Sequence, residues 1–147
     1  METLNYEMVI NAPIGRIWNL LWDPETYPIW KQFFAPGSKM TSDWEVGGKT
    51  YFTDQSGDGM VSTITSLEIP THVIFSHLGH VKDGVEDTES RAVKEWSGAE
   101  EKYFLRAIDE NTTELRAVVH SVGYQEEMMN NGFNQGFEMI KKLAETA

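Results

Sequence analysis

The chain of 147 residues contains no cysteine. This absence excludes disulfide bonds, thiolate zinc sites and cysteine nucleophiles, and it is consistent with a reducing compartment. Long hydrophobic runs are also missing, since no stretch approaches the roughly 18 apolar residues that a membrane span requires. The N-terminal residues METLNYEMVI lack the pattern of a secretory signal. We therefore expect a soluble, cytoplasmic protein with no membrane partner.

Basic residues are scarce. The 12 lysines and arginines are outnumbered by 23 aspartates and glutamates, which gives a formal net charge of −11. Such a chain repels phosphate backbones and anionic lipid surfaces, so we expect no nucleic acid partner. The charge by itself indicates good solubility. The length suits one domain, and we predict a single domain over residues 1–147.

The first third of the chain predicts one strand followed by two short helices. Residues 4–11 alternate apolar and polar side chains, the pattern of a strand with one buried face. Pro13 suits the first turn of a helix, which we expect to end at Asp23-Pro24. A second short helical piece is predicted within residues 25–33. The apolar residues of the first helix recur at spacings of three and four: Ile14, Ile17, Trp18 and Leu21.

Six further segments predict strands separated by glycine-rich or polar turns: residues 38–44, 50–54, 60–69, 72–78, 102–108 and 114–121. No helix separates successive strands apart from the two at the start, so an antiparallel sheet of about seven strands is expected. Residues 79–101 form the least regular part of the chain. We interpret them as a mobile hairpin extension, with a lid over a binding site as the alternative.

The last segment, residues 125–147, predicts one long amphipathic helix. Gly132 and Gly136 lie inside it, where each costs up to about 1 kcal/mol relative to alanine. Close packing or a neighbouring void would account for them. The apolar face of the helix comprises Met129, Phe133, Gly136, Phe137, Ile140, Leu143 and Ala144.

The residue types needed for catalysis show no clear arrangement. The histidines at positions 72, 77, 80 and 120 lack metal-ligand spacing, so we expect no metal site, and we interpret them as surface or edge residues. Ser76-His77 and His120-Ser121 are sequence neighbours that would point to opposite faces of a strand. Asp54, Glu95 and Glu101 could face a cavity, but solvated surface charge is the default interpretation.

The order of these segments resembles the SRPBCC, or START-like, superfamily over nearly the whole chain. Within it, the chain is most similar to single-domain bacterial proteins related to activators of the heat-shock chaperone ATPase. The strongest matches are the Ala12-Pro13 entry to the first helix, the Val46-Gly47-Gly48 turn and the Glu68-Ile69-Pro70 end of a strand. The resemblance implies an α+β, helix-grip fold, in which a curved antiparallel sheet wraps around the long C-terminal helix and leaves an internal cavity.

We therefore predict that the cavity between the sheet and this helix binds a small hydrophobic or aromatic molecule, without a cofactor. The alternative for every candidate residue is that it simply fills the core. The candidates are Trp18, Trp22, Trp30, Tyr103, Leu105, Leu115, Ala117, Val119, Met129, Phe133, Gly136 and Phe137.

Two other functions stay open. The resemblance implies a possible chaperone partner, although eukaryotic activators carry an additional N-terminal domain that provides much of the contact. An enzyme resembling the polyketide cyclases of the same superfamily ranks third, because no acid, base or metal set can be identified. The sequence favours a binding protein without deciding the question of catalysis.

Overall fold

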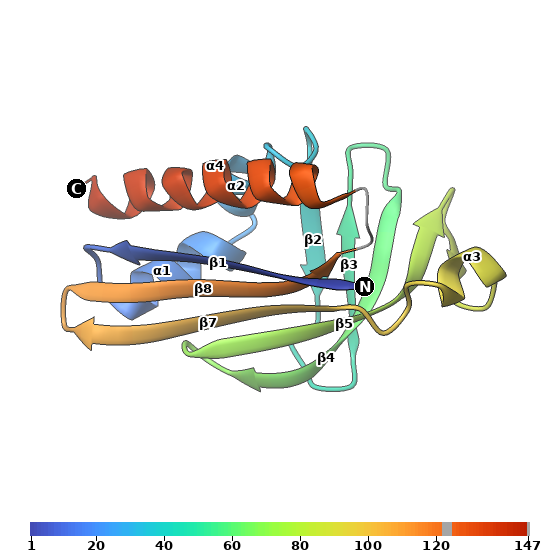
Figure 1. Ribbon diagram of the computed structural model, residues 1–147, viewed down its shortest axis with the longest axis horizontal. Coiled ribbons are helices and arrows are strands. Elements are labelled where there is room, and N and C mark those ends of the chain that lie inside the picture. Colours follow the sequence, from blue (N-terminus) through green and yellow to red (C-terminus); the bar gives the residue numbers. More distant parts are fainter. Residues whose placement is uncertain (122–124, 147) are drawn as a thin grey trace.

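The computed structural model describes residues 1–121 and 125–146, and these form one curved sheet covered on its inner side by helices (Figure 1). The sheet has eight antiparallel strands in the order β1-β8-β7-β5-β4-β3-β2, with β6 paired to β5. The predicted antiparallel α+β fold is therefore confirmed. The strands are β1 (Glu2–Ile10), β2 (Lys39–Ser42), β3 (Lys49–Thr53), β4 (Gly59–Glu68), β5 (His72–Lys82), β6 (Val85–Asp87), β7 (Glu100–Asp109) and β8 (Thr112–Ser121).

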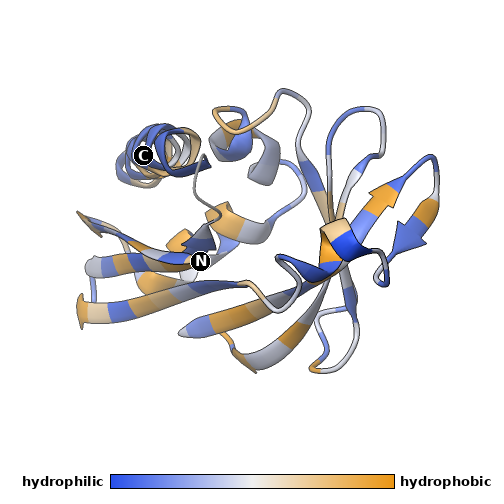
Figure 2. Cartoon of the chain, turned by 45° about the vertical axis from the view of Figure 1, so that its right-hand side comes forward, coloured by the Kyte–Doolittle hydropathy of each residue, from blue (hydrophilic) through white to orange (hydrophobic). Residues whose placement is uncertain are grey.

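The helices are α1 (Ile14–Trp22), α2 (Tyr27–Lys31), α3 (Arg91–Lys94) and α4 (Glu126–Glu145). The long helix α4 packs against β1, α1 and α2. Figure 2 views α4 nearly end on and shows the sheet passing below and then beside the helices, the arrangement expected of a helix-grip fold. Within the described part of the chain, no helix combines the length and the hydropathy needed to cross a membrane.

The hydrophobic core fills the space between the sheet and the helices α1, α2 and α4. The alternating pattern of the first strand places Tyr6 and Ile10 in this core, and the first helix contributes Ile17 and Leu21, which are fully buried. The helix ends at Trp22, directly before Asp23-Pro24, as the proline predicts. Local periodicity was therefore sufficient to assign the buried faces of these elements.

The segment 79–101 is more regular than the sequence analysis predicts. The strand β5 continues to Lys82, β6 pairs back onto it, and α3 begins after Ser90, whose hydroxyl accepts a hydrogen bond from the Val93 amide. Asp83 and Gly84 both have positive φ, as a tight two-residue hairpin turn requires. The hairpin extension is confirmed, but the expectation of an irregular loop was wrong, because short paired strands carry too few residues to show a periodic pattern.

The two glycines of α4 are explained by close packing. A Cβ atom at Gly136 would lie 2.8 Å from the carbonyl oxygen of Trp30, and one at Gly132 would meet the ring of Phe34. The absence of side chains at these positions therefore allows α4 to approach α2 and the residues that follow it.

We expect Gly136→Ala to lower the free energy of unfolding by about 1–3 kcal/mol, because the added methyl group must displace the backbone at Trp30. Gly15→Ala in α1 is the matched control, since a Cβ there meets nothing within 4 Å. This control should be neutral or stabilising by up to about 1 kcal/mol. Urea denaturation measures both changes, and equal midpoints for the two variants would contradict the packing argument.

Candidate functional site

A cavity of about 330 Å³ opens between α2, the first turns of α4 and the ends of strands β3, β4 and β7. Its walls are mostly apolar, and the lining includes Phe34, Phe52, Met60, Met128, Met129 and Phe133. Two lysines and three carboxylates also border it: Lys31, Lys39, Asp54, Asp58 and Glu101. Apolar walls with a few polar groups are the usual form of a small-molecule site.

Met129 and Phe133 are the two predicted lining residues that border this cavity. Tyr103 adjoins it through a hydrogen bond from its hydroxyl to Glu101. Trp18 and Trp22 border a separate hollow of about 240 Å³ beside Trp44. The remaining predicted residues pack in the core or at the contact between helices, and their contact with a ligand stays a prediction: Trp30, Leu105, Leu115, Ala117, Val119, Gly136 and Phe137.

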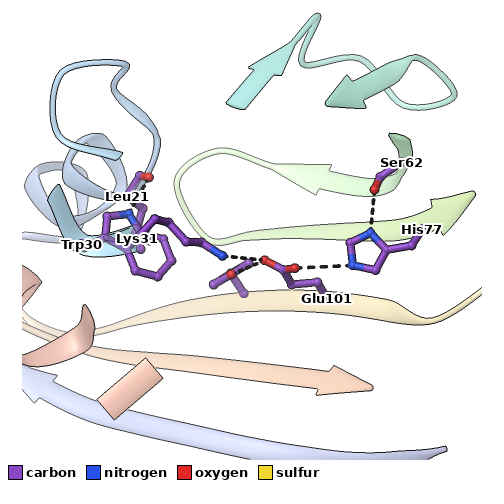
Figure 3. Close-up of polar contacts among 7 residues, drawn as sticks. Leu21, Trp30, Lys31, Ser62, His77 and Glu101 are labelled. Carbon is purple, nitrogen blue, oxygen red and sulfur yellow. Dashed lines mark hydrogen bonds and ion pairs between the residues drawn. The ribbon is translucent and has the colours of Figure 1, made fainter. Parts of the chain in front are cut away.

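A buried ion pair borders the cavity. Lys31 is the last residue of α2 and Glu101 the second residue of β7, and Lys31 Nζ lies 3.5 Å from Glu101 Oε2 (Figure 3). The two side chains are 10% and 11% exposed. Trp30 anchors the helix beside this pair, since its Nε1 donates to the Leu21 carbonyl oxygen at 3.0 Å.

Further donors from the sheet converge on Glu101. His77 Nε2 lies 3.4 Å from Glu101 Oε1, and the Tyr103 hydroxyl donates to Oε2. On its other side, His77 Nδ1 lies 2.6 Å from the Ser62 hydroxyl oxygen. A carboxylate can only accept, so Nε2 carries the proton toward Glu101, and in the neutral imidazole Nδ1 accepts the hydroxyl proton of Ser62.

These partners determine the ionisation of Glu101. Burial alone would raise its pKa, but the Lys31 ammonium and the hydrogen bonds from His77 and Tyr103 outweigh burial and hold the pKa well below its ordinary value. Burial and the neighbouring Glu101 charge raise the pKa of Tyr103 well above its usual range. Glu101 is therefore a stable buried carboxylate, and Tyr103 remains a hydrogen-bond donor.

Aromatic rings surround the other end of the ion pair. The Lys31 ammonium lies 4.4 Å from the ring centroid of Phe34 and 4.9 Å from that of Trp30. The rings of Phe133 and Tyr27 follow at 5.6 and 5.8 Å. The faces of such rings attract a cation, which offsets part of the cost of removing the ammonium from water.

The structure corrects two expectations about charged and polar residues. His77 is only 7% exposed and lies inside the sheet, so its assignment to the surface was wrong, and Glu101 is buried too. Asp54 borders the cavity, whereas Glu95 is exposed. The period of two in β5 contained the signal for His77, because it shares the inward face with Val73 and Phe75.

Sequence reasoning also missed Lys31 and Ser62. Lys31 follows Tyr27 by four residues, a spacing that places both on one face of α2. Ser62, His77 and Glu101 form a serine-histidine-carboxylate chain, but Ser62 is fully buried and does not border the cavity. We therefore interpret this chain as a support for Glu101. Among the described residues, no three histidine or acidic side chains are placed to hold a metal ion.

Glu101→Gln should lower the free energy of unfolding by about 3–5 kcal/mol near neutral pH, because Lys31 is left buried without its carboxylate. The pKa of Glu101 is lower in the folded than in the unfolded protein, so its contribution is complete above the unfolded value of about 4.3 and declines as the pH falls below it. The stability difference between the native protein and the variant should therefore shrink from about pH 5 downward.

Glu114→Gln provides the control, because Glu114 pairs with Arg106, whose side chain is 66% exposed. This change should cost at most about 1 kcal/mol. Chemical denaturation over a series of pH values measures both variants. A difference for Glu101→Gln that stays constant down to about pH 3 would contradict the assigned ionisation.

Solved structures of other proteins share this fold. The Aha1 dimer from Colwellia psychrerythraea is 17% identical, with a TM-score of 0.72 over 99% of this chain and 98% of that one. Protein MLL2253 from Mesorhizobium loti is 16% identical, with a TM-score of 0.68 over 97% and 96% of the two chains. PFC0360w, an HSP90 activator from Plasmodium falciparum, is 17% identical, with a TM-score of 0.65 over 97% and 95%.

At such low identity these likenesses show the fold alone. No curated protein sequence matches the chain significantly. The model of one protein family, described as activator of Hsp90 ATPase homolog 1-like protein, matches residues 11–145. Because this match spans nearly the whole sequence, the chain belongs to the family of activator of Hsp90 ATPase homolog 1-like proteins.

Proposed function

We propose that the cavity beside the first turns of α4 binds a small apolar or aromatic molecule. The observation that carries this proposal is a mostly apolar space of about 330 Å³ whose lining includes a buried pair of charges. Ligand sites in proteins commonly measure about 300–1,000 Å³ and combine apolar walls with a few fixed polar groups.

The energetic cost of this arrangement supports binding over simple packing. Apolar side chains that line a cavity instead of packing against one another forgo part of the stabilisation that burial gives. The two ions of a buried pair also lose their hydration. Good pairing geometry and further hydrogen bonds are needed to offset this cost in free energy. Neither feature is needed to cover the sheet, because the core next to it is filled by Trp30, Tyr103 and Phe137. A bound molecule would provide contacts to the apolar walls and a polar partner for the ion pair.

The walls of the cavity suit ligands of varied shape. Met60, Met128 and Met129 border it from β4 and α4. Methionine side chains are unbranched and polarisable, so they adapt to different surfaces. Phe34 and Phe133 provide flat faces, with their ring centroids 4.9 Å apart and their planes nearly perpendicular. A planar aromatic ring can stack on one of them while its edge meets the other.

A panel of sterols, fatty acids, flavonoids and aromatic polyketides tests this proposal by amide chemical shifts. A true ligand should shift the signals of residues 128–133 together with those of β3 and β4. Ala35→Phe fills the cavity from its wall and should weaken binding by about tenfold or more, through the loss of at least 1.4 kcal/mol of contact energy.

Ala92→Phe in α3 is the matched control, since Ala92 is exposed and does not border the cavity. It should leave the affinity unchanged. Shifts confined to the outer surface for every compound, or equal affinities for the native protein and Ala35→Phe, would argue against a cavity ligand.

A second candidate function is contact with an Hsp90-type chaperone. Membership of a family described by activation of the Hsp90 ATPase supports it, as does the fold shared with a protein described as an HSP90 activator. This proposal predicts a saturable rise in the ATP turnover of such a chaperone when the protein is added. An unrelated protein of similar negative charge is the control. A flat calorimetric titration against the chaperone would remove this candidate.

A further inference from the structure

We propose that the cavity selects aromatic molecules that carry an uncharged acceptor oxygen, such as a ketone, and that Lys31 is the residue that recognises this oxygen. The inference rests on the proposed binding function and adds the chemical class of the ligand. It depends on a difference within the buried ion pair: Glu101 uses most of its hydrogen-bond acceptor sites, whereas Lys31 uses few of its donors.

Three of the roughly four acceptor sites of the Glu101 carboxylate are in use. Tyr103 and Lys31 both donate to Oε2, and His77 lies against Oε1. Lys31 differs, because an ammonium carries three N–H donors. Among the described residues, Glu101 is the one hydrogen-bond acceptor recorded for Lys31 Nζ, at 3.5 Å, the outer limit for such a bond. Lys31, which borders the cavity, therefore has donor capacity that Glu101 does not use.

The rings around Lys31 leave this capacity available. The ring centroids of Phe34, Trp30, Phe133 and Tyr27 lie 4.4–5.8 Å from the ammonium, and these rings offer no oxygen to which its N–H groups could donate a hydrogen bond. Phe34 and Phe133 border the cavity as well. A ligand ring in contact with Phe34 and Phe133 would lie next to Lys31. An oxygen attached to that ring could then accept a hydrogen bond from the Lys31 ammonium. The aromatic residues thus favour a ligand ring, and Lys31 favours a hydrogen-bond acceptor on the same molecule.

The charges along the lining favour an uncharged oxygen over a carboxylate. Asp54, Asp58 and Glu101 outnumber Lys31 and Lys39 on the cavity wall. Glu101 lies beside the ammonium that would hold the ligand, so a second anion there would be repelled at short range. A ketone oxygen accepts the hydrogen bond from Lys31 without this repulsion.

Two compounds of nearly the same shape test the inference. 2-Acetonaphthone presents a carbonyl oxygen, and 2-isopropenylnaphthalene replaces that oxygen with a methylene group. Lys31→Met should weaken binding of the ketone by about tenfold or more, the loss of a hydrogen bond to a charged group. It should change binding of the hydrocarbon by less than about twofold, because a methionine preserves the apolar stem. Comparing each compound across variants cancels their different solubilities.

Lys142→Met in α4 is the matched control, since Lys142 is an exposed lysine that does not border the cavity. It should leave the affinities for both compounds unchanged. Lys31→Met combined with Glu101→Gln removes both buried charges. This double variant replaces Lys31→Met in the binding comparison if the single variant unfolds. It should show the same selective loss of the ketone. 2-Naphthoate should bind the native protein more weakly than the ketone, and tighter binding of the carboxylate would overturn the choice of an uncharged oxygen.

The possible failures are distinguishable. If Lys31→Met weakens the ketone and the hydrocarbon equally, the cavity binds aromatic molecules but Lys31 does not select their oxygen, and the inference is wrong. If neither compound, nor any of the wider panel, shifts the amide signals of residues 128–133, the proposed binding function itself fails.

Discussion

The buried contact between Lys31 and Glu101 is the constraint on which the arrangement of the site depends. It joins the end of α2 to the start of β7 across the interior. Each ion loses several kcal/mol of hydration on burial, so the pair persists only with further partners. Tyr103 and His77 supply hydrogen bonds to the carboxylate, while Trp30 and Phe34 place aromatic faces near the ammonium. The short helix is thereby held over the sheet by polar contacts as well as by burial.

The closing helix α4 contacts both the core and the cavity. At Gly136 its backbone lies so close to Trp30 that no side chain fits, and Ile140 and Ala144 continue the contact with the core. Toward its beginning, Met129 and Phe133 border the cavity instead. One face of a single amphipathic helix thus seals the core at one end and forms a wall of the cavity at the other.

The inner face of the sheet carries polar side chains as well as apolar ones. Cross-strand hydrogen bonds join Ser42 to Thr50 and Ser62 to His77, and the last of these residues contacts Glu101. Polar pairs of this kind add cross-strand contacts to the pairing of these strands. The family shares a fold whose strands could carry many different inward side chains, so the chemistry of this site belongs to the residues of this chain.

The sequence by itself determined the order of elements, the antiparallel sheet and the long closing helix, because the periods of two and 3.6 are local properties of neighbouring residues. It also placed Met129 and Phe133 on the face that borders the cavity. Only the tertiary structure decided which inward residues pack solidly and which leave space. It also brought together Lys31 and Glu101, charged residues that local patterns assign to the surface, since their burial depends on pairing between distant segments that no local period encodes.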